Sequence, residues 1–310
     1  MRPIVILVTV VALAALAAPK FMFPLVAIDM LCFGLFAVAL DLLFGFVGLL
    51  SFGQAMFWGG AGYVAAILVE RMHADATLAI GAAILYAALL ALIVGTICVR
   101  RSGIYFAMIT LGIAQIEYFI AVQLPNLTGG ENGLPLETRG RFFGFPMEND
   151  VVFYFVVLAI VAICVALLFR VVNSPFGIVL SAISQNEQRA VALGYRVHRY
   201  KLAIFVMAGA LSGLAGALFA LANHLAGLEM LDWHTSGSVV MMAVLGGSGT
   251  LIGPIIGAAV YESLNYFVSK TPIGQQTDLV MGLIFAACVL AFRRGIAGGL
   301  LSLTWRKTST

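Results

Sequence analysis

The side chains of this chain that could do chemistry gather in one short stretch, SQNEQRAVALGYRVHRYK, at positions 184–201. Charged side chains recur there, although only 10% of the whole chain is charged and 62% is hydrophobic. Ser184 followed three residues later by Glu187 is the pattern of a helix capping box. Gly194 stands where a glycine commonly ends a helix. The stretch therefore predicts a short helix over about 185–193, outside the apolar segments that flank it.

Such a helix can serve either of two kinds of binding. An amphipathic helix that rests on anionic lipid needs a large apolar face, and the run Ala190–Leu193 offers small aliphatic side chains without aromatic residues. A short, rigid helix of this composition fits a groove on another protein better. We therefore favour protein docking, with lipid contact as the alternative. Upstream, Ser174 and Pro175 in NSPFG predict the start of another helix.

Other chemistry finds little support in the sequence. The glycine-rich GGSGTLIG at 246–253 has no lysine, so it is not a nucleotide-binding P-loop. Ser51 in LSFGQ has no identifiable base, and no His, Cys, Asp or Glu residues have the spacing of metal ligands. The four cysteines are scattered without a CxxC spacing. We expect no catalytic residue, no metal and no cofactor bound by this chain, and hence no enzyme.

The elements that position the charged stretch are membrane spans. The mean hydropathy is +1.07, and runs of about 17–25 mainly apolar residues, each long enough to cross a bilayer, recur along the chain. They are continuous rather than alternating, which favours helices over a β-barrel. The predicted fold is an all-α polytopic bundle that forms a single transmembrane domain over 1–310. Its predicted spans are 3–18, 24–43, 45–69, 77–99, 104–122, 151–169, 201–222, 235–249, 250–268 and 276–292.

Orientation follows from the distribution of Lys and Arg. With an even number of spans and both termini in the cytoplasm, twelve of these residues fall on the inner side and five on the outer side. The net charge of +3 is then explained by topology and not by nucleic-acid binding. The first twenty residues also fit a signal peptide, but keeping them as a span completes the even count. We expect a multi-pass membrane protein with an outer loop at 123–150 and a cytoplasmic segment at 172–200.

A solute path is expected where polar residues and glycines interrupt the spans. Glycines crowd 45–62 and 237–257, and interrupted spans in the two halves of a transporter point to a path near the midplane. We expect unwound or broken helix at 45–62 and 246–254, whereas Gly209, Gly213 and Gly216 suit close helix packing. Asp29 and Asp41 are expected at the membrane interfaces, and Glu117 either lines the path or reaches the interface. The candidate path residues are Gln54, Gln115, Glu117, Gly246, Gly247 and Gly249.

Several stretches together resemble one family. SPFGIVLSAISQNEQRAVALGYRVHRYKLAIFVMAGALSGLAGALFA (174–220) is similar to the signature of LivM-type permease subunits of branched-chain amino acid ABC importers. GLLSFGQAMFWGGAGYVAAIL, SGIYFAMITLGIAQI, TGGENGLP and VLGGSGTLIGPIIGAAVYE agree with it in the family's order. The resemblance covers most of the chain. It departs from the family in Gln54, where many relatives have His, and this leaves the substrate open.

The resemblance implies a set of partners and roles. They are a homologous LivH-like permease, two ABC ATPase subunits that bind ATP and Mg, a periplasmic substrate-binding protein, and membrane lipid. It implies that residues 184–194 form the coupling helix that receives the ATP-driven movement, and that the 123–150 loop helps to dock the binding protein. The coupling residues would be Asn186, Glu187, Arg189, Ala190, Leu193 and Gly194, and the docking residues Thr128, Gly129, Gly130 and Asn132.

The expected function is then import of a small polar solute, with branched-chain amino acids as the family default and urea, amides and aromatic acids as alternatives. A transporter driven by an ion gradient is the other class to consider. It predicts intramembrane carboxylates that couple transport to an ion, for which Glu117 is the candidate, and it needs no ATPase. A passive channel would leave the capped helix at 185–193 without a role.

Overall fold

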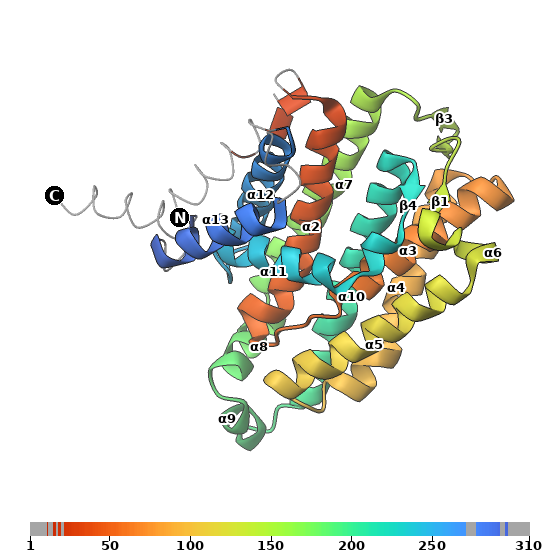
Figure 1. The fold of residues 1–310 in the computed structure, drawn as a ribbon. Helices are drawn as coiled ribbons and strands as arrows, with labels where there is room; N and C mark the ends of the chain where they lie inside the picture. Colours follow the sequence, from red (N-terminus) through yellow and green to blue (C-terminus); the bar gives the residue numbers. More distant parts are fainter. Residues whose placement is uncertain are drawn as a thin grey trace.

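The computed structural model describes residues 22–270 and 277–291, with a few isolated positions outside these ranges. Helices make up most of this part of the chain, and its strands are two-residue pairs in loops (Figure 1), which confirms the all-α class. The long helices are α2 (Pro24–Val47), α3 (Gln54–Met72), α4 (Ala76–Cys98), α5 (Ile104–Gln123), α7 (Asp150–Val172), α10 (Val197–Asn223), α11 (Trp233–Gly246), α12 (Gly253–Ser269) and α13 (Thr277–Ala291).

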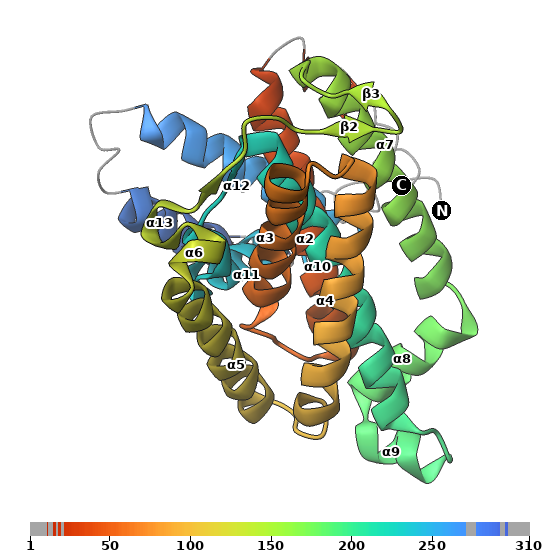
Figure 2. The same ribbon diagram turned by 90° about the vertical axis from the view of Figure 1, so that its right-hand side faces the viewer.

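The core of the bundle forms around α10, which packs against α2, α3 and α4 (Figures 1 and 2). Its glycines face these neighbours at very short range. A Cβ atom at Gly213 would lie 2.3 Å from the Cβ of Ala87, and one at Gly216 would lie 2.0 Å from the carbonyl oxygen of Trp58. The prediction that Gly209, Gly213 and Gly216 serve close packing is therefore confirmed.

Five of the described helices, α2, α4, α5, α7 and α10, are long and apolar enough to cross a membrane. α3, with 19 residues, is not among them, and α11, α12 and α13 have 14, 17 and 15 residues. At 1.5 Å per residue α11 is about 21 Å long, shorter than a hydrocarbon core of about 30 Å. Figure 1 shows it lying across the direction of α2. The predicted span 235–249 thus does not cross by itself, and the predicted span 3–18 falls outside the described ranges.

The two ends of the bundle differ. At one, which we call the loop end, β1 (Leu134–Pro135) pairs antiparallel with β4 (Leu225–Ala226). The buried Arg139 fastens this end by an ion pair of 2.6 Å to Asp150 and a hydrogen bond to the carbonyl oxygen of Ala222. The remaining loop-end elements are α6 (Pro125–Thr128), η1 (Gly130–Asn132), β2 (Arg141–Phe142), β3 (Phe145–Pro146) and η2 (Leu228–Leu231).

The opposite end, which we call the α9 end, carries two short helices between α7 and α10. They are α8 (Pro175–Gln185), which begins at the predicted Ser174–Pro175 signal, and α9 (Glu187–Ala192). α8 packs against α2 as well as α9. Figure 2 shows α9 projecting beyond the main bundle.

Candidate functional site

The capped segment at the α9 end is a helix, but its cap differs from the predicted one. Ser184 lies inside α8, and the Asn186 side chain instead caps α9 by accepting a hydrogen bond of 2.9 Å from the Arg189 backbone N–H. The predicted capping box of Ser184 and Glu187 is therefore wrong. Because α8 continues through Gln185, the N-cap position of α9 falls on Asn186 and not on Ser184. Gly194 follows the end of α9 with a φ of +88°, as predicted for a terminating glycine.

α9 is held from one side and open on the other. Ala190 is buried against the core, and Glu187 pairs at 2.7 Å with Lys201 of α10, whose side chain is itself buried. Arg189 is exposed. Two apolar side chains also face outward, since Val191 is 57% and Leu193 70% exposed. The segment is thus a fixed helix that presents an apolar tip.

The non-helical interruptions in the two glycine-rich segments are shorter than predicted. The chain between α2 and α3 is non-helical only at 48–53, and α3 runs unbroken through Gly59, Gly60 and Gly62. The predicted break within 45–62 is therefore confirmed at 48–53. The rest of the segment is helical, because these three glycines instead admit neighbouring side chains, such as Leu231 at Gly59. The second interruption is confirmed at 247–252, between α11 and α12.

Gln54 occupies the first position of α3, in a buried polar cluster. Its side chain is fully buried, and its Oε1 accepts a hydrogen bond of 3.0 Å from Ser212, near the middle of α10. One residue on, the Ala55 backbone N–H donates to the Ser236 hydroxyl at 2.9 Å, so the first turns of α3 and α11 meet here. The Nε2 of Gln54 has no partner among the described residues. Because an unpaired buried amide is costly, this N–H group is available to donate a hydrogen bond to a further group.

Glu117 faces inward and does not reach the interface. Its Oε1 accepts a hydrogen bond of 2.7 Å from the Tyr86 hydroxyl and lies against Gly60 of α3. Its Oε2 is buried without a partner in the described chain, as is the Nε2 of Gln115. Gly60 is six residues, or about 9 Å of helix rise, beyond Gln54. At 3.6 residues per turn the two positions point about 120° apart around α3, so the structure places the polar candidates in two separate clusters.

The glycines at 246–249 belong to a different contact, with α2. Asp41 is fully buried, and both of its carboxylate oxygens accept hydrogen bonds from the Gly249 backbone N–H, at 2.9 and 3.0 Å. A Cβ at Gly45, one turn later on α2, would lie 2.3 Å from that same nitrogen. The prediction that Asp41 is interfacial is wrong, because the carboxylate serves as an acceptor for the 247–252 loop. We call this contact the Asp41 latch.

Gly246 and Gly247 shape the loop that the Asp41 latch holds. A Cβ at Gly246 would lie 1.9 Å from the Gly253 carbonyl oxygen, and Gly247 has a φ of +109°. Both positions therefore require glycine. The loop bends sharply enough to bring α12 back against α11, and these two helices pack together.

The candidate docking residues at the loop end form a compact turn. The Thr128 hydroxyl donates to the Ala121 carbonyl oxygen at 2.8 Å and accepts from the Gly130 N–H at 3.2 Å. Thr128 and Gly130 are buried, and Gly129 has a φ of +81°. Of the four predicted docking residues, only Asn132 is exposed. The other three shape the turn that presents it.

Sequence reasoning missed one polar region. Asp29, predicted at the interface, accepts a hydrogen bond of 2.8 Å from the Asn223 side chain and faces a cavity that Glu262 also lines. Glu262 was not a candidate, although Tyr261, Glu262 and Asn265 have the spacing of one helix face in an otherwise apolar segment. In the described ranges no three His, Cys, Asp or Glu residues come together as a possible metal site.

Comparison with known proteins gives a consistent result. The model of the family described as "Branched-chain amino acid transport system / permease component" matches residues 22–292. The high-affinity branched-chain amino acid transport system permease protein LivM of Escherichia coli (strain K12) is 27% identical over 244 residues, 71% of this chain and 57% of that protein. A probable LivM permease of Methanocaldococcus jannaschii is 25% identical over 281 residues, 76% of this chain and 79% of that protein.

The relatives include permeases that are named for other solutes. The ribose import permease protein RbsC of Bacillus subtilis (strain 168) is 30% identical over 174 residues, 53% of each chain. No solved structure matches this chain significantly. The matched part spans 57–58% of the length of the bacterial LivM relatives, so their activity as whole proteins does not transfer directly.

Proposed function

The chain belongs to the family of branched-chain amino acid transport system permease components, and we propose that it is the membrane-spanning permease subunit of an ATP-driven importer. It would pass a small polar solute, with branched-chain amino acids first, from a periplasmic binding protein to the cytoplasm. The assembly would comprise a second, homologous permease of the LivH type and two ATPase subunits that bind ATP and Mg. Its place would be the bacterial inner membrane, with the α9 end in the cytoplasm.

The observation that carries this proposal is the geometry of α9. A helix of six residues, capped by Asn186 and ended by Gly194, stands at the extremity of the bundle with Val191 and Leu193 exposed. Short apolar tips on a fixed helix are suited to insertion into a protein groove. The ion pair between Glu187 and Lys201 ties this tip to α10, which contacts α2, α3 and α4. Force applied to α9 would therefore reach the centre of the bundle.

The solute path would pass the Gln54 cluster. The first turns of α3 and α11 meet there beside the middle of α10, and helix N-termini inside a membrane protein favour anionic groups of a substrate. The unpartnered Nε2 of Gln54 adds a hydrogen-bond donor. Glu117 and Gln115 of α5 would line the path further toward the loop end, where Glu117 lies against Gly60 of α3, and Asn132 would take part in docking the binding protein.

The test is solute uptake into vesicles that contain the chain with its four co-expressed partner subunits. We expect uptake of L-leucine to require internal ATP, both ATPases and the binding protein. Omission of the ATPases supplies the control. If uptake instead proceeds without them and follows a sodium or proton gradient, the chain is a secondary transporter, and the Glu117 carboxylate becomes the candidate coupling group.

A substitution at Gln54 separates a structural role from a role in the path. Gln54→Leu removes the Nε2 that lacks a partner among the described residues together with the Oε1 that accepts from Ser212, and the two effects oppose each other, so we expect the free energy of unfolding to change by no more than about 1 kcal/mol. We expect uptake to fall by about threefold to fivefold, because one hydrogen bond to a solute contributes about 1 kcal/mol. Ser212→Ala, which removes the partner of Oε1, is the matched control. Unchanged uptake by Gln54→Leu would exclude Gln54 from the path.

A further inference from the structure

A polar cavity lies within the bundle, apart from the Gln54 cluster. It has a volume of about 340 Å³ and is lined from α2, α10, α11, α12 and α13. That volume is in the range of pockets for small ligands. Its polar lining residues are Asp29, Thr235, Ser238, Tyr261, Glu262 and Asn265.

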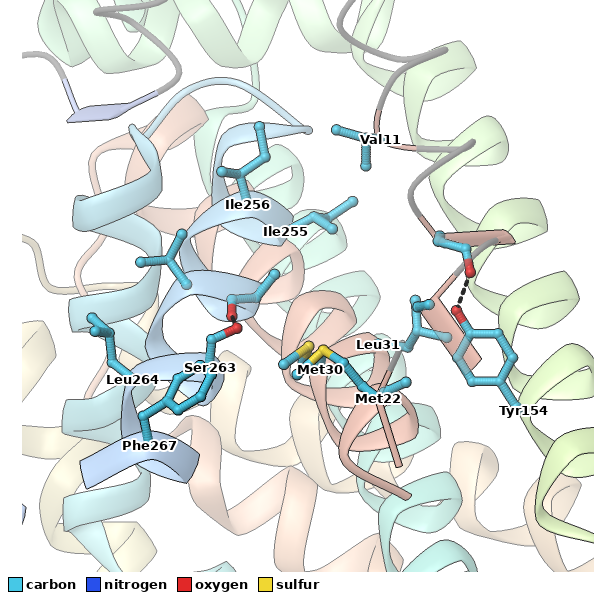
Figure 3. A pocket seen from close by; sticks show the side chains of 15 residues that line it. Val11, Met22, Met30, Leu31, Tyr154, Ile255, Ile256, Ser263, Leu264 and Phe267 are labelled. Atoms are coloured by element: carbon cyan, nitrogen blue, oxygen red, sulfur yellow. Dashed lines mark hydrogen bonds between the residues drawn. The ribbon is translucent and has the colours of Figure 1, made fainter. Parts of the chain in front are cut away.

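α12 separates this cavity from an apolar one. Figure 3 shows Ile255, Ile256, Leu264 and Phe267 around the second cavity, which has a volume of about 740 Å³ and an almost wholly apolar lining. Tyr261, Glu262 and Asn265 of α12 line the first cavity, whereas Ser263 lines the second and donates its hydroxyl to the Ala259 carbonyl oxygen of the same helix. The helix therefore has an apolar face and a polar face. A polar face of this kind in a membrane bundle commonly borders a water-filled or ligand-binding space.

The chemistry of the polar cavity is that of a cation site. Asp29 and Glu262 line it from two different helices, and no Lys, Arg or His is among the described residues that line it. Two aromatic rings, Phe33 and Phe219, form part of the same wall, 5.3 Å apart and edge to face. Carboxylates and aromatic faces both attract an ammonium group. The hydroxyls of Thr235 and Ser238 add neutral hydrogen-bonding groups.

We propose that this cavity binds the ammonium group of the transported solute, with Asp29 and Glu262 supplying the negative charge. The assignment rests on the proposed function and makes it more specific, because it selects solutes with a primary amine over neutral amides, sugars and simple carboxylic acids. Asp29 sits near the start of α2 and Asn223, its hydrogen-bond donor, at the end of α10. The cavity therefore lies toward the loop end, where a solute released by the binding protein would enter.

The test measures the charge preference of the cavity without transport. Ser238→Cys is introduced into the full chain after Cys32, Cys98, Cys164 and Cys288 are replaced by alanine. The new thiol is modified with 2-aminoethyl methanethiosulfonate, a cation, or 2-sulfonatoethyl methanethiosulfonate, an anion. Each rate is divided by the rate of the same reagent with free 2-mercaptoethanol. We expect the cation to react at least tenfold faster, as in clefts lined by one sign of charge.

Neutral variants identify the source of that preference. Asp29→Asn combined with Glu262→Gln should reduce the ratio to within about twofold of unity. Glu148→Gln, an exposed carboxylate at the loop end, should leave it unchanged. We further expect L-leucine to slow the modification and 4-methylpentanoate, the same skeleton without the amine, to have no effect.

Several outcomes would overturn the proposal. They are equal rates for the two reagents, a ratio that survives neutralisation of both carboxylates, and equal protection by the two solutes. A thiol that neither reagent reaches before denaturation would also overturn it, because the cavity would then be closed to solutes. None of these results depends on the ATPases. ATP-driven uptake by the unmodified chain would still test the importer function separately.

Discussion

Replacing Leu193 by aspartate is expected to reduce ATP-driven uptake at least a hundredfold while the permease still folds and enters the membrane. Leu193 is 70% exposed, so the change removes little packing within the chain. In the proposed complex the same side chain is buried in the ATPase. A carboxylate without a partner in such an interface costs several kcal/mol, and hundredfold corresponds to about 2.7 kcal/mol.

The measurement is co-purification of the ATPase subunits with the tagged permease, beside uptake. Leu127→Asp is the matched control, because Leu127 is an exposed leucine of α6 at the loop end, away from α9. We expect Leu193→Asp to release the ATPases and Leu127→Asp to retain them. Retention of the ATPases by Leu193→Asp, with normal uptake, would show that the tip of α9 is not the docking element.

Asp41→Ala is expected to lower uptake at least tenfold. The substitution removes both acceptors of the Gly249 N–H and leaves that group unpaired, which costs about 1–3 kcal/mol. We expect most of this cost to appear as release of the 247–252 loop and not as global unfolding, because the hydrogen bonds of the Asp41 carboxylate are made to the backbone of that loop. Asp41 lies in the C-terminal part of α2, whose C-cap residue is Gly48. A Cβ atom at Gly48 would lie 3.7 Å from the Ser184 hydroxyl oxygen of α8, so α8 lies against this end of α2.

Two further variants show whether the latch acts through hydrogen bonding or through fit. Asp41→Asn retains one carbonyl acceptor and should keep more activity than Asp41→Ala. Gly45→Ala keeps the carboxylate, but its Cβ would lie 2.3 Å from the Gly249 nitrogen, so the loop must move. Asp75→Ala, an exposed carboxylate without a capping hydrogen bond, is the control. Uptake within twofold of wild type for both Asp41→Ala and Gly45→Ala would contradict a role for the latch.

Together these contacts outline a route through the molecule. α9 is tied to α10 by the pair of Glu187 and Lys201, and α8 reaches the end of α2. α2 in turn carries Asp41, which holds the loop between α11 and α12. α11 meets α3 at Ser236, next to Gln54. Movement at the α9 end would thereby reach the polar residues in the middle of the bundle.

The fold class and the positions of most long helices could be predicted from the amino-acid sequence alone. The predicted spans 24–43, 77–99, 104–122 and 151–169 coincide with α2, α4, α5 and α7 to within a few residues. This succeeds because a helix satisfies its own backbone and an apolar run of sufficient length marks it locally. The roles of the glycine that ends α9 and of the packing glycines of α10 could also be predicted, because each role depends only on the position of the glycine along one helix.

Which polar residues contact one another depends on how the helices pack and could not be predicted from the sequence. Gly249 and Asp41 are separated by 208 positions, Asn223 and Asp29 by 194, and Ser212 and Gln54 by 158. Asp41 and Asp29 read as interfacial because a carboxylate near the end of an apolar run normally reaches water. No local sequence pattern predicts the distant backbone N–H or side-chain amide that donates to each buried carboxylate. The physical reason is that desolvation is compensated by a partner from another helix, and helix packing alone selects that partner.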